Sequence, residues 1–242
     1  MNKKKALKIF IPVGTISLIF ISCLGYMSYY MKAKDVDTYL KSSTTVKVSK
    51  EKKNIFFDGP GNDNLLVFYP GAQVDEKAYA PLCYSLSLIG LDTVIVKQPM
   101  HWAFFGVNKA DIVFEEHKGY NNYFIGGHSL GGAMSAEYVY KTNNDIKGLI
   151  FFAAYSAKDL KNKEDLNVLS IYGDKDGVIK MKNVEKGREY MPNSYTEVVI
   201  KGGNHAQFGR YGKQNGDHNA TISEEEQLSR TIATIGNWMT NI

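Results

Sequence analysis

The sequence has few of the residues that build metal centres and disulfide frameworks. Its 242 residues include 2 cysteines and 5 histidines. Cys23 falls in an apolar N-terminal stretch and Cys83 in a predicted helix, so we expect no disulfide framework. Cysteines and histidines do not occur together at zinc-binding spacing either. We interpret Cys83 as a small buried apolar residue rather than a reactive thiol.

The chain also lacks an excess of positive charge outside its first residues. Lys3, Lys4, Lys5 and Lys8 account for the whole formal charge of +4, and the remaining sequence is close to neutral. Nucleic-acid binding depends on lysines and arginines that neutralise phosphates, and no stripe of such residues is present. We therefore do not expect a nucleic-acid partner.

The apolar run over residues 9–30 is the longest in the chain, and it contains no charged residue. Its length predicts a transmembrane anchor, because about twenty apolar residues cross a bilayer. Four lysines precede the run, whereas only Lys32 and Lys34 follow closely, which places the basic residues 1–8 in the cytoplasm. We expect a single-pass protein of the cell membrane whose main domain, after the run, is extracytoplasmic.

Two other interpretations of this run compete with the anchor. One is a cleaved signal peptide, although no small-residue cleavage pattern follows the run. The other is lipidation at Cys23, which follows Phe20, Ile21 and Ser22. All three interpretations place the body outside the cytoplasm. Residues 31–43 are interpreted as a polar stalk, and the length of the chain favours one domain over residues 44–242.

The body alternates between short apolar runs and longer segments with helical periodicity. Residues 44–48 and 54–57 predict an edge hairpin. The continuous apolar runs indicate strands buried on both faces, and their alternation with helices predicts an α/β fold with a mostly parallel sheet covered on both sides. The predicted strands are 65–69, 93–97, 123–127, 148–152, 167–172 and 196–200, and the predicted helices are 76–89, 108–117, 130–142, 181–190 and 223–241.

Residues 127–131 read Gly-His-Ser-Leu-Gly, which matches the Gly-x-Ser-x-Gly pattern of a nucleophile elbow. A predicted strand precedes the pattern, and a helix start rich in small residues follows it. The nucleophilic serine must lie on a tight turn, where a side chain on either flank would clash with nearby backbone. Ser129 is therefore our candidate nucleophile. His128 is expected to pack or hydrogen-bond beside it rather than act as the base.

A serine hydroxyl needs a base to take its proton and a carboxylate to orient that base. Asp174 and Asp176 both follow the strand predicted at residues 167–172. His205 follows the next strand, in a glycine-containing loop, which makes it the candidate base. His101, His117 and His218 have no such context.

Taken together, these motifs resemble the α/β-hydrolase superfamily over about residues 54–242, and most closely its compact bacterial branch of dienelactone-hydrolase-like proteins. The segments that carry the resemblance are residues 69–71, 127–131, 173–176 and 202–208. The resemblance implies a triad in the chain order serine, acid, histidine. The family's Gly-x-x-Asp turn favours Asp176 as the acid, and leaves Asp174 as a turn or capping residue.

The family also implies an oxyanion hole formed by two backbone N–H groups. By position these belong to Leu130 and Ala72, although Pro70-Gly71 stands where many members have His-Gly. Neither a metal nor an organic cofactor is implied. The 46 residues between Ser129 and Asp176 are too few for an inserted lid domain. Residues 207–221 are expected near the site, and the aromatic residues within 98–105 are candidates for an acyl pocket.

The resemblance implies hydrolysis of carboxylic esters through an acyl-enzyme, with a small-molecule or lipid-like acyl substrate. The same triad also serves amidases, peptidases and acyltransferases, so these activities stay open. A membrane-anchored binding domain without catalysis is a further alternative, because fold does not determine function.

Overall fold

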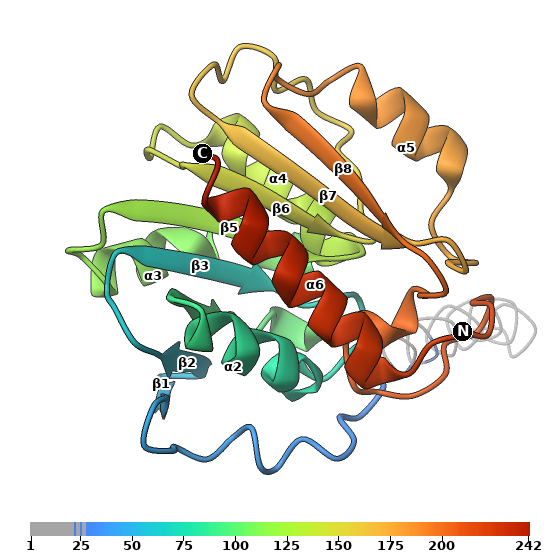
Figure 1. The fold of residues 1–242 in the computed structure, drawn as a ribbon, viewed down its shortest axis with the longest axis horizontal. Coiled ribbons are helices and arrows are strands. Elements are labelled where there is room, and N and C mark those ends of the chain that lie inside the picture. Colours follow the sequence, from blue (N-terminus) through green and yellow to red (C-terminus); the bar gives the residue numbers. More distant parts are fainter. Residues whose placement is uncertain (1–21, 23–24, 26–27) are drawn as a thin grey trace, which may run out of the picture.

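The computed structural model describes residues 22, 25 and 28–242. An eight-stranded sheet forms its centre (Figure 1). The strands are β1 (Lys47–Glu51), β2 (Asn54–Asp58), β3 (Asn64–Tyr69), β4 (Leu91–Ile95), β5 (Asn122–His128), β6 (Gly148–Phe152), β7 (Asn167–Gly173) and β8 (Tyr195–Ile200). The α-helices are α2 (Ala80–Leu88), α3 (Lys109–Glu116), α4 (Leu130–Lys141), α5 (Met181–Arg188) and α6 (Glu224–Met239). Short 3₁₀ helices are η1 (Glu76–Tyr79), η2 (Pro99–His101), η3 (Ala103–Phe105) and η4 (Ala206–Phe208).

The sheet is mostly parallel, as predicted, with strand order β1-β2-β4-β3-β5-β6-β7-β8. Strand β2 is antiparallel to β1 and β4, so the predicted hairpin lies at the sheet edge. All other neighbouring strands are parallel. Consequently the carboxyl ends of β3, β5, β6, β7 and β8 lie along the same edge of the sheet.

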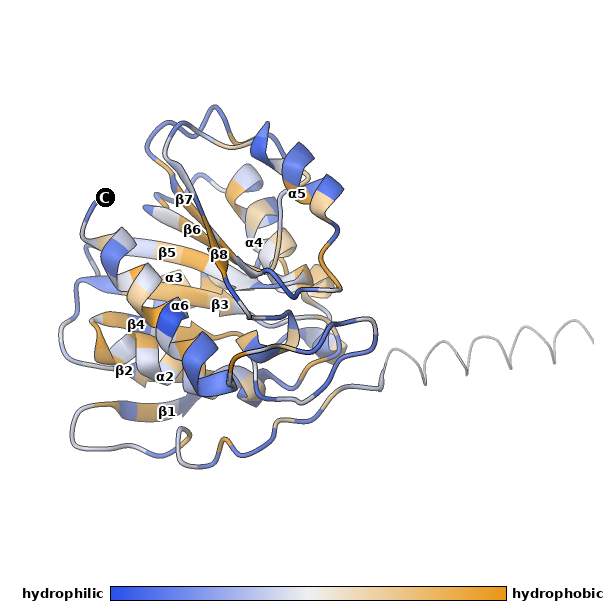
Figure 2. Ribbon diagram, turned by 45° about the vertical axis from the view of Figure 1, so that its right-hand side comes forward, coloured by the Kyte–Doolittle hydropathy of each residue, from blue (hydrophilic) through white to orange (hydrophobic). Residues whose placement is uncertain are grey.

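Both faces of the sheet are buried. Along β3, Leu65 and Val67 pack in one hydrophobic cluster, while Leu66 and Phe68 pack in the other. Successive side chains of a strand point to opposite faces, so this alternation requires cover on both sides. Helices α2 and α6 cover one face, and α3 and α4 the other. The hydrophobic strands lie inside this cover, and the outer sides of α5 and α6 carry hydrophilic residues (Figure 2).

The predicted elements differ from the observed ones mainly at their ends. The strand predicted at residues 93–97 begins at Leu91 and ends at Ile95. The helix predicted at residues 76–89 divides into η1 and α2. Pro81 lies in the first turn of α2, where its missing N–H breaks no intrahelical hydrogen bond.

Residues 31–43, predicted as a stalk, lie along the domain. Val36 is buried in the cluster beneath α2 and α6, where Tyr39 and Leu40 also pack. The Met31 N–H donates to the Gln73 carbonyl (2.7 Å). The domain boundary at residue 44 stays a prediction.

The prediction of a transmembrane anchor at residues 9–30 needs correction. Within residues 22, 25 and 28–242, no helix combines the length and the apolarity that a bilayer crossing requires. Tyr30, at the end of the predicted span, instead stacks on His101 with ring centroids 4.0 Å apart. Residues 9–21, 23, 24, 26 and 27 lie outside the described residues. On this finding, the predicted transmembrane segment and the extracytoplasmic localisation derived from it are wrong.

Candidate active site

Ser129 lies on a strained turn between β5 and α4. Its φ of 53° and ψ of −121° are unusual for a residue with a side chain. The Ser129 N–H donates to the carbonyl of Phe152 at the end of β6 (2.9 Å). This turn presents the serine at the carboxyl edge of the sheet, as a nucleophile elbow does.

Two glycines allow the turn to approach the neighbouring loop. A Cβ at Gly127 would lie 2.4 Å from the Tyr69 carbonyl oxygen, and one at Gly131 would lie 2.1 Å from it. These distances are far below van der Waals contact, so side chains at either position would push the loop after β3 away. The two glycines of the Gly-x-Ser-x-Gly pattern are therefore explained by crowding.

Asp176 and His205 come together from the loops that follow β7 and β8. The distance between His205 Nδ1 and Asp176 Oδ2 is 2.8 Å, and both side chains are 1% exposed. The other carboxylate oxygen, Asp176 Oδ1, accepts hydrogen bonds from the N–H groups of Val178 and Ile179, both at 2.8 Å. These bonds satisfy the buried carboxylate and fix its orientation toward the imidazole.

The two ring nitrogens of His205 differ in their hydrogen bonds. A carboxylate only accepts hydrogen bonds, so Nδ1 carries the ring proton and leaves Nε2 with a free lone pair. Nε2 is buried and has no hydrogen-bond partner within the described part of the chain. Ser129 and His205 line one cavity of about 260 Å³. The other lining residues are Leu130, Ala133, Ala153, Ala154, Tyr155, Val178, Ile179 and Lys180.

The two predicted oxyanion donors differ in their relation to this cavity. Leu130 lines it and begins α4, so its N–H has no intrahelical acceptor. Ala72 is not one of the lining residues. The loop before it is nevertheless held close to the elbow, because the Gly71 N–H donates to the Tyr79 hydroxyl (3.0 Å). The second donor stays a prediction.

His128 joins the loop after β3 to the loop of His205. The Tyr79 hydroxyl donates to His128 Nδ1 (2.9 Å), and His128 Nε2 donates to the carbonyl of His205 (3.1 Å). Burial holds the pKa of His128 well below its usual range, and the neighbouring His205 adds to this effect. His128 therefore stays neutral. Nothing in the sequence indicated the contacts that join Tyr79, His128 and His205, because these residues are far apart along the chain.

Other sequence candidates lie elsewhere. Asp174 Oδ1 accepts from the Gly202 N–H (2.6 Å), a contact between turns rather than with a histidine. His117 contacts Glu51, and His101 contacts Glu76. The aromatic residues within 98–105 do not line the cavity of Ser129, so the suggestion that they form an acyl pocket gains no support from it. In the described residues no three His, Cys, Asp or Glu side chains gather as metal ligands would.

Comparison with known proteins identifies the family. The model of the Alpha/beta hydrolase family matches residues 65–229, and the chain belongs to this family. No protein with a curated description matches the chain in sequence. The match covers the elbow, both turns that follow β7 and β8, and the first part of α6.

Solved structures share the same fold at low sequence identity. A soluble variant of monoglyceride lipase from Saccharomyces cerevisiae is 13% identical, with a TM-score of 0.58 over 84% of this chain and 96% of that one. The monoacylglycerol lipase of Paleococcus ferrophilus is 14% identical, with a TM-score of 0.59 and coverage of 79% and 99%. A carboxylesterase from Bacillus subtilis is 10% identical, with a TM-score of 0.53 and coverage of 83% and 95%.

These findings confirm the predicted fold class. The chain has the α/β-hydrolase fold, with a mostly parallel sheet and helices on both faces. Within the described residues, only α4, β6 and connecting loops separate Ser129 from β7, so this stretch holds no large lid domain.

The neutral state of His128 predicts a pH-dependent contribution to stability. The unfolded chain binds a proton at this histidine below about pH 6.5, whereas the folded protein does not, so acid favours unfolding. Wild-type protein should lose about 1 kcal/mol more unfolding free energy than His128→Gln between about pH 7.5 and pH 5.5. Urea unfolding at the two pH values measures this difference. Equal pH dependence in both proteins would contradict the prediction.

Proposed function

We propose that this protein is a serine hydrolase in which Ser129 is the nucleophile, His205 the general base and Asp176 the acid that orients the base. The observation that carries the proposal is the buried contact between His205 and Asp176 beside the cavity of Ser129. The free Nε2 of His205 is the atom that would accept the serine proton.

The proposed reaction follows from these positions. His205 Nε2 takes the proton of Ser129 Oγ as the oxygen bonds to the substrate carbonyl carbon. The tetrahedral intermediate then expels the alcohol, which receives that proton from His205, and an acyl-enzyme remains. Water attacks the acyl group with His205 again as base, which releases the acid and restores the serine. The N–H groups of Leu130 and Ala72 are the proposed donors to the oxyanion.

Carboxylic esters are the proposed substrates. The support comes from the lipases and the carboxylesterase that share this fold, and from a cavity whose lining, apart from Ser129, His205, Tyr155 and Lys180, consists of alanine and aliphatic side chains. Amides, peptides and acyl transfer use the same chemistry, and assays with amide substrates distinguish them. A relation to the dienelactone-hydrolase-like branch is proposed from the compact domain and the motifs around the triad.

Replacement of the nucleophile gives the most direct test. Ser129→Ala should lose labelling by a fluorophosphonate probe, and kcat should fall by roughly 10⁶-fold, as when such a triad loses its serine. The matched control is Ser156→Ala, since the Ser156 hydroxyl bonds to the Lys158 backbone in the loop after β6, where it donates to the carbonyl and accepts from the N–H (both 2.9 Å). The control should label as wild type does. Equal labelling of Ser129→Ala would refute the assignment, and failure of folded wild-type protein to label would refute the proposed function.

The two aspartates after β7 should differ in their effect on catalysis. Asp176→Asn replaces the carboxylate that orients His205, so kcat should fall by about 10⁴-fold. Asp174→Asn keeps an acceptor for the Gly202 N–H and should lose much less. Steady-state kinetics of both variants on one ester measure this ranking. The reverse order would assign the acid to Asp174.

The size of the cavity predicts a preference for short acyl chains. At about 260 Å³ it is smaller than most pockets that hold drug-sized ligands. The kcat/KM for hydrolysis of p-nitrophenyl butyrate should therefore be at least about tenfold above that for p-nitrophenyl palmitate. Tyr155→Ala removes a ring that lines the cavity and should shift the optimum toward longer chains. An unchanged preference in this variant would show that acyl chains bind elsewhere.

A further inference from the structure

A second carboxylate, Asp217, lies where the loops of the proposed acid and base meet. It belongs to the segment between η4 and α6, which sequence analysis placed near the site without assigning it a role. From its contacts we infer that Asp217 is a positioning residue, which holds the Asp176 loop and the His205 loop in register. This inference rests on the proposed function.

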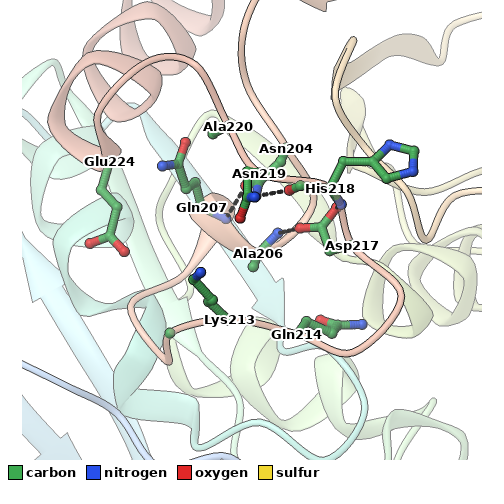
Figure 3. A pocket seen from close by; sticks show the side chains of 11 residues that line it. Asn204, Ala206, Gln207, Lys213, Gln214, Asp217, His218, Asn219, Ala220 and Glu224 are labelled. Atoms are coloured by element: carbon green, nitrogen blue, oxygen red, sulfur yellow. Dashed lines mark hydrogen bonds between the residues drawn. The ribbon is translucent and has the colours of Figure 1, made fainter.

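Asp217 accepts hydrogen bonds from the backbone of both loops. The N–H of Gly177, the residue after Asp176, donates to Asp217 Oδ1 (2.9 Å). The N–H of Ala206, the residue after His205, donates to Asp217 Oδ2 (2.9 Å). The N–H of His205 also approaches Oδ1 at 3.4 Å. Figure 3 shows the carboxylate turned toward Ala206. One side chain therefore bridges the residues that follow the acid and the base.

The geometry uses both oxygens of the carboxylate. Oδ1 accepts from Gly177 in the Asp176 loop and also from the N–H of His218 (3.0 Å), with the N–H of His205 more distant. Oδ2 accepts from Ala206 in the His205 loop, and a carboxylate can accept at both oxygens. An amide has one oxygen, so in Asp217→Asn its NH₂ group would oppose one of these N–H groups. That contact is repulsive and leaves a backbone donor without an acceptor. Asp217→Asn should thus break the link between the Asp176 loop and the His205 loop.

The position of Asp217 is itself fixed on both sides. A Cβ at Gly177 would lie 2.5 Å from the Gly216 carbonyl oxygen, so this segment packs directly on the acid loop. On the other side, the Asn204 amide donates to the His218 carbonyl (2.8 Å), and Asn204 Oδ1 accepts from the Gln207 N–H (3.1 Å), as Figure 3 shows. The carboxylate is therefore a fixed part of the site rather than a mobile surface group.

Asp217 acts through the triad and not on the substrate. It lines a separate polar cavity of about 300 Å³ and does not line the cavity of Ser129. Loss of its hydrogen bonds should disturb the contact of His205 with Asp176 while leaving the acyl pocket intact. The expected consequence is a lower kcat at a nearly unchanged KM.

Kinetics of three variants test the effect on turnover. Asp217→Asn should lower kcat by about 10²-fold, the scale of a small misplacement of catalytic groups, with KM within about twofold. Asp217→Glu retains two carboxylate oxygens and should recover part of the loss. The control is Asp159→Asn, an exposed aspartate whose carboxylate caps the Lys161 N–H in a surface turn. Wild-type kcat in Asp217→Asn would overturn the inference.

A spectroscopic measurement separates positioning from a general effect on folding. The proton on His205 Nδ1 gives a downfield NMR resonance, which is recorded in the inactive Ser129→Ala protein with and without Asp217→Asn or Asp217→Glu. The resonance should broaden or move upfield with asparagine and return toward its original position with glutamate. A loss of kcat with an unchanged resonance would overturn the inference. If Ser129→Ala keeps activity, the proposed function fails, and the resonance still decides whether Asp217 holds His205 against Asp176.

Discussion

The contact between a buried imidazole and a buried carboxylate determines much of the architecture around it. A carboxylate shielded from water is costly unless hydrogen bonds replace its hydration. At Asp176 the bonds come from Val178, Ile179 and His205, so the turn after β7 must fold back on its own side chain. The loop after β8 must place the His205 ring beside the buried Asp176 carboxylate. The parallel pairing of β7 with β8 makes this possible, because it aligns the ends of the two strands.

The turn of the proposed nucleophile depends on a different constraint, which is the lack of space between backbone segments. The turn at Ser129 is pressed against the loop after β3, with room for no side chain at Gly127 or Gly131. A series of hydrogen bonds then connects the Gly71 N–H, through the Tyr79 hydroxyl and the His128 ring, to the carbonyl of His205. Through these contacts, the segments proposed to supply the oxyanion donor, the nucleophile and the base form one connected unit, although they are far apart in the sequence.

Much of the fold was predictable because its signals are local. Continuous apolar runs marked the parallel strands, and the glycines around Ser129 marked the tight turn. The hydrogen bonds of Asp217 and Tyr79 were not predictable, since both residues act on groups that only tertiary folding brings near. The transmembrane prediction rested on hydropathy, which scores each residue alone. Within the described residues, Tyr30 at the end of the predicted span stacks on His101 of the folded domain.

The walls of the cavity of Ser129 and the members of the proposed triad come partly from different segments. Ala153, Ala154 and Tyr155 follow β6, the one strand between β5 and β8 whose loop contributes no member of the proposed triad. Substitutions in that loop can alter the shape of the cavity without moving Ser129, Asp176 or His205. During divergence, a protein built in this way can exchange one substrate for another while its reaction chemistry is preserved.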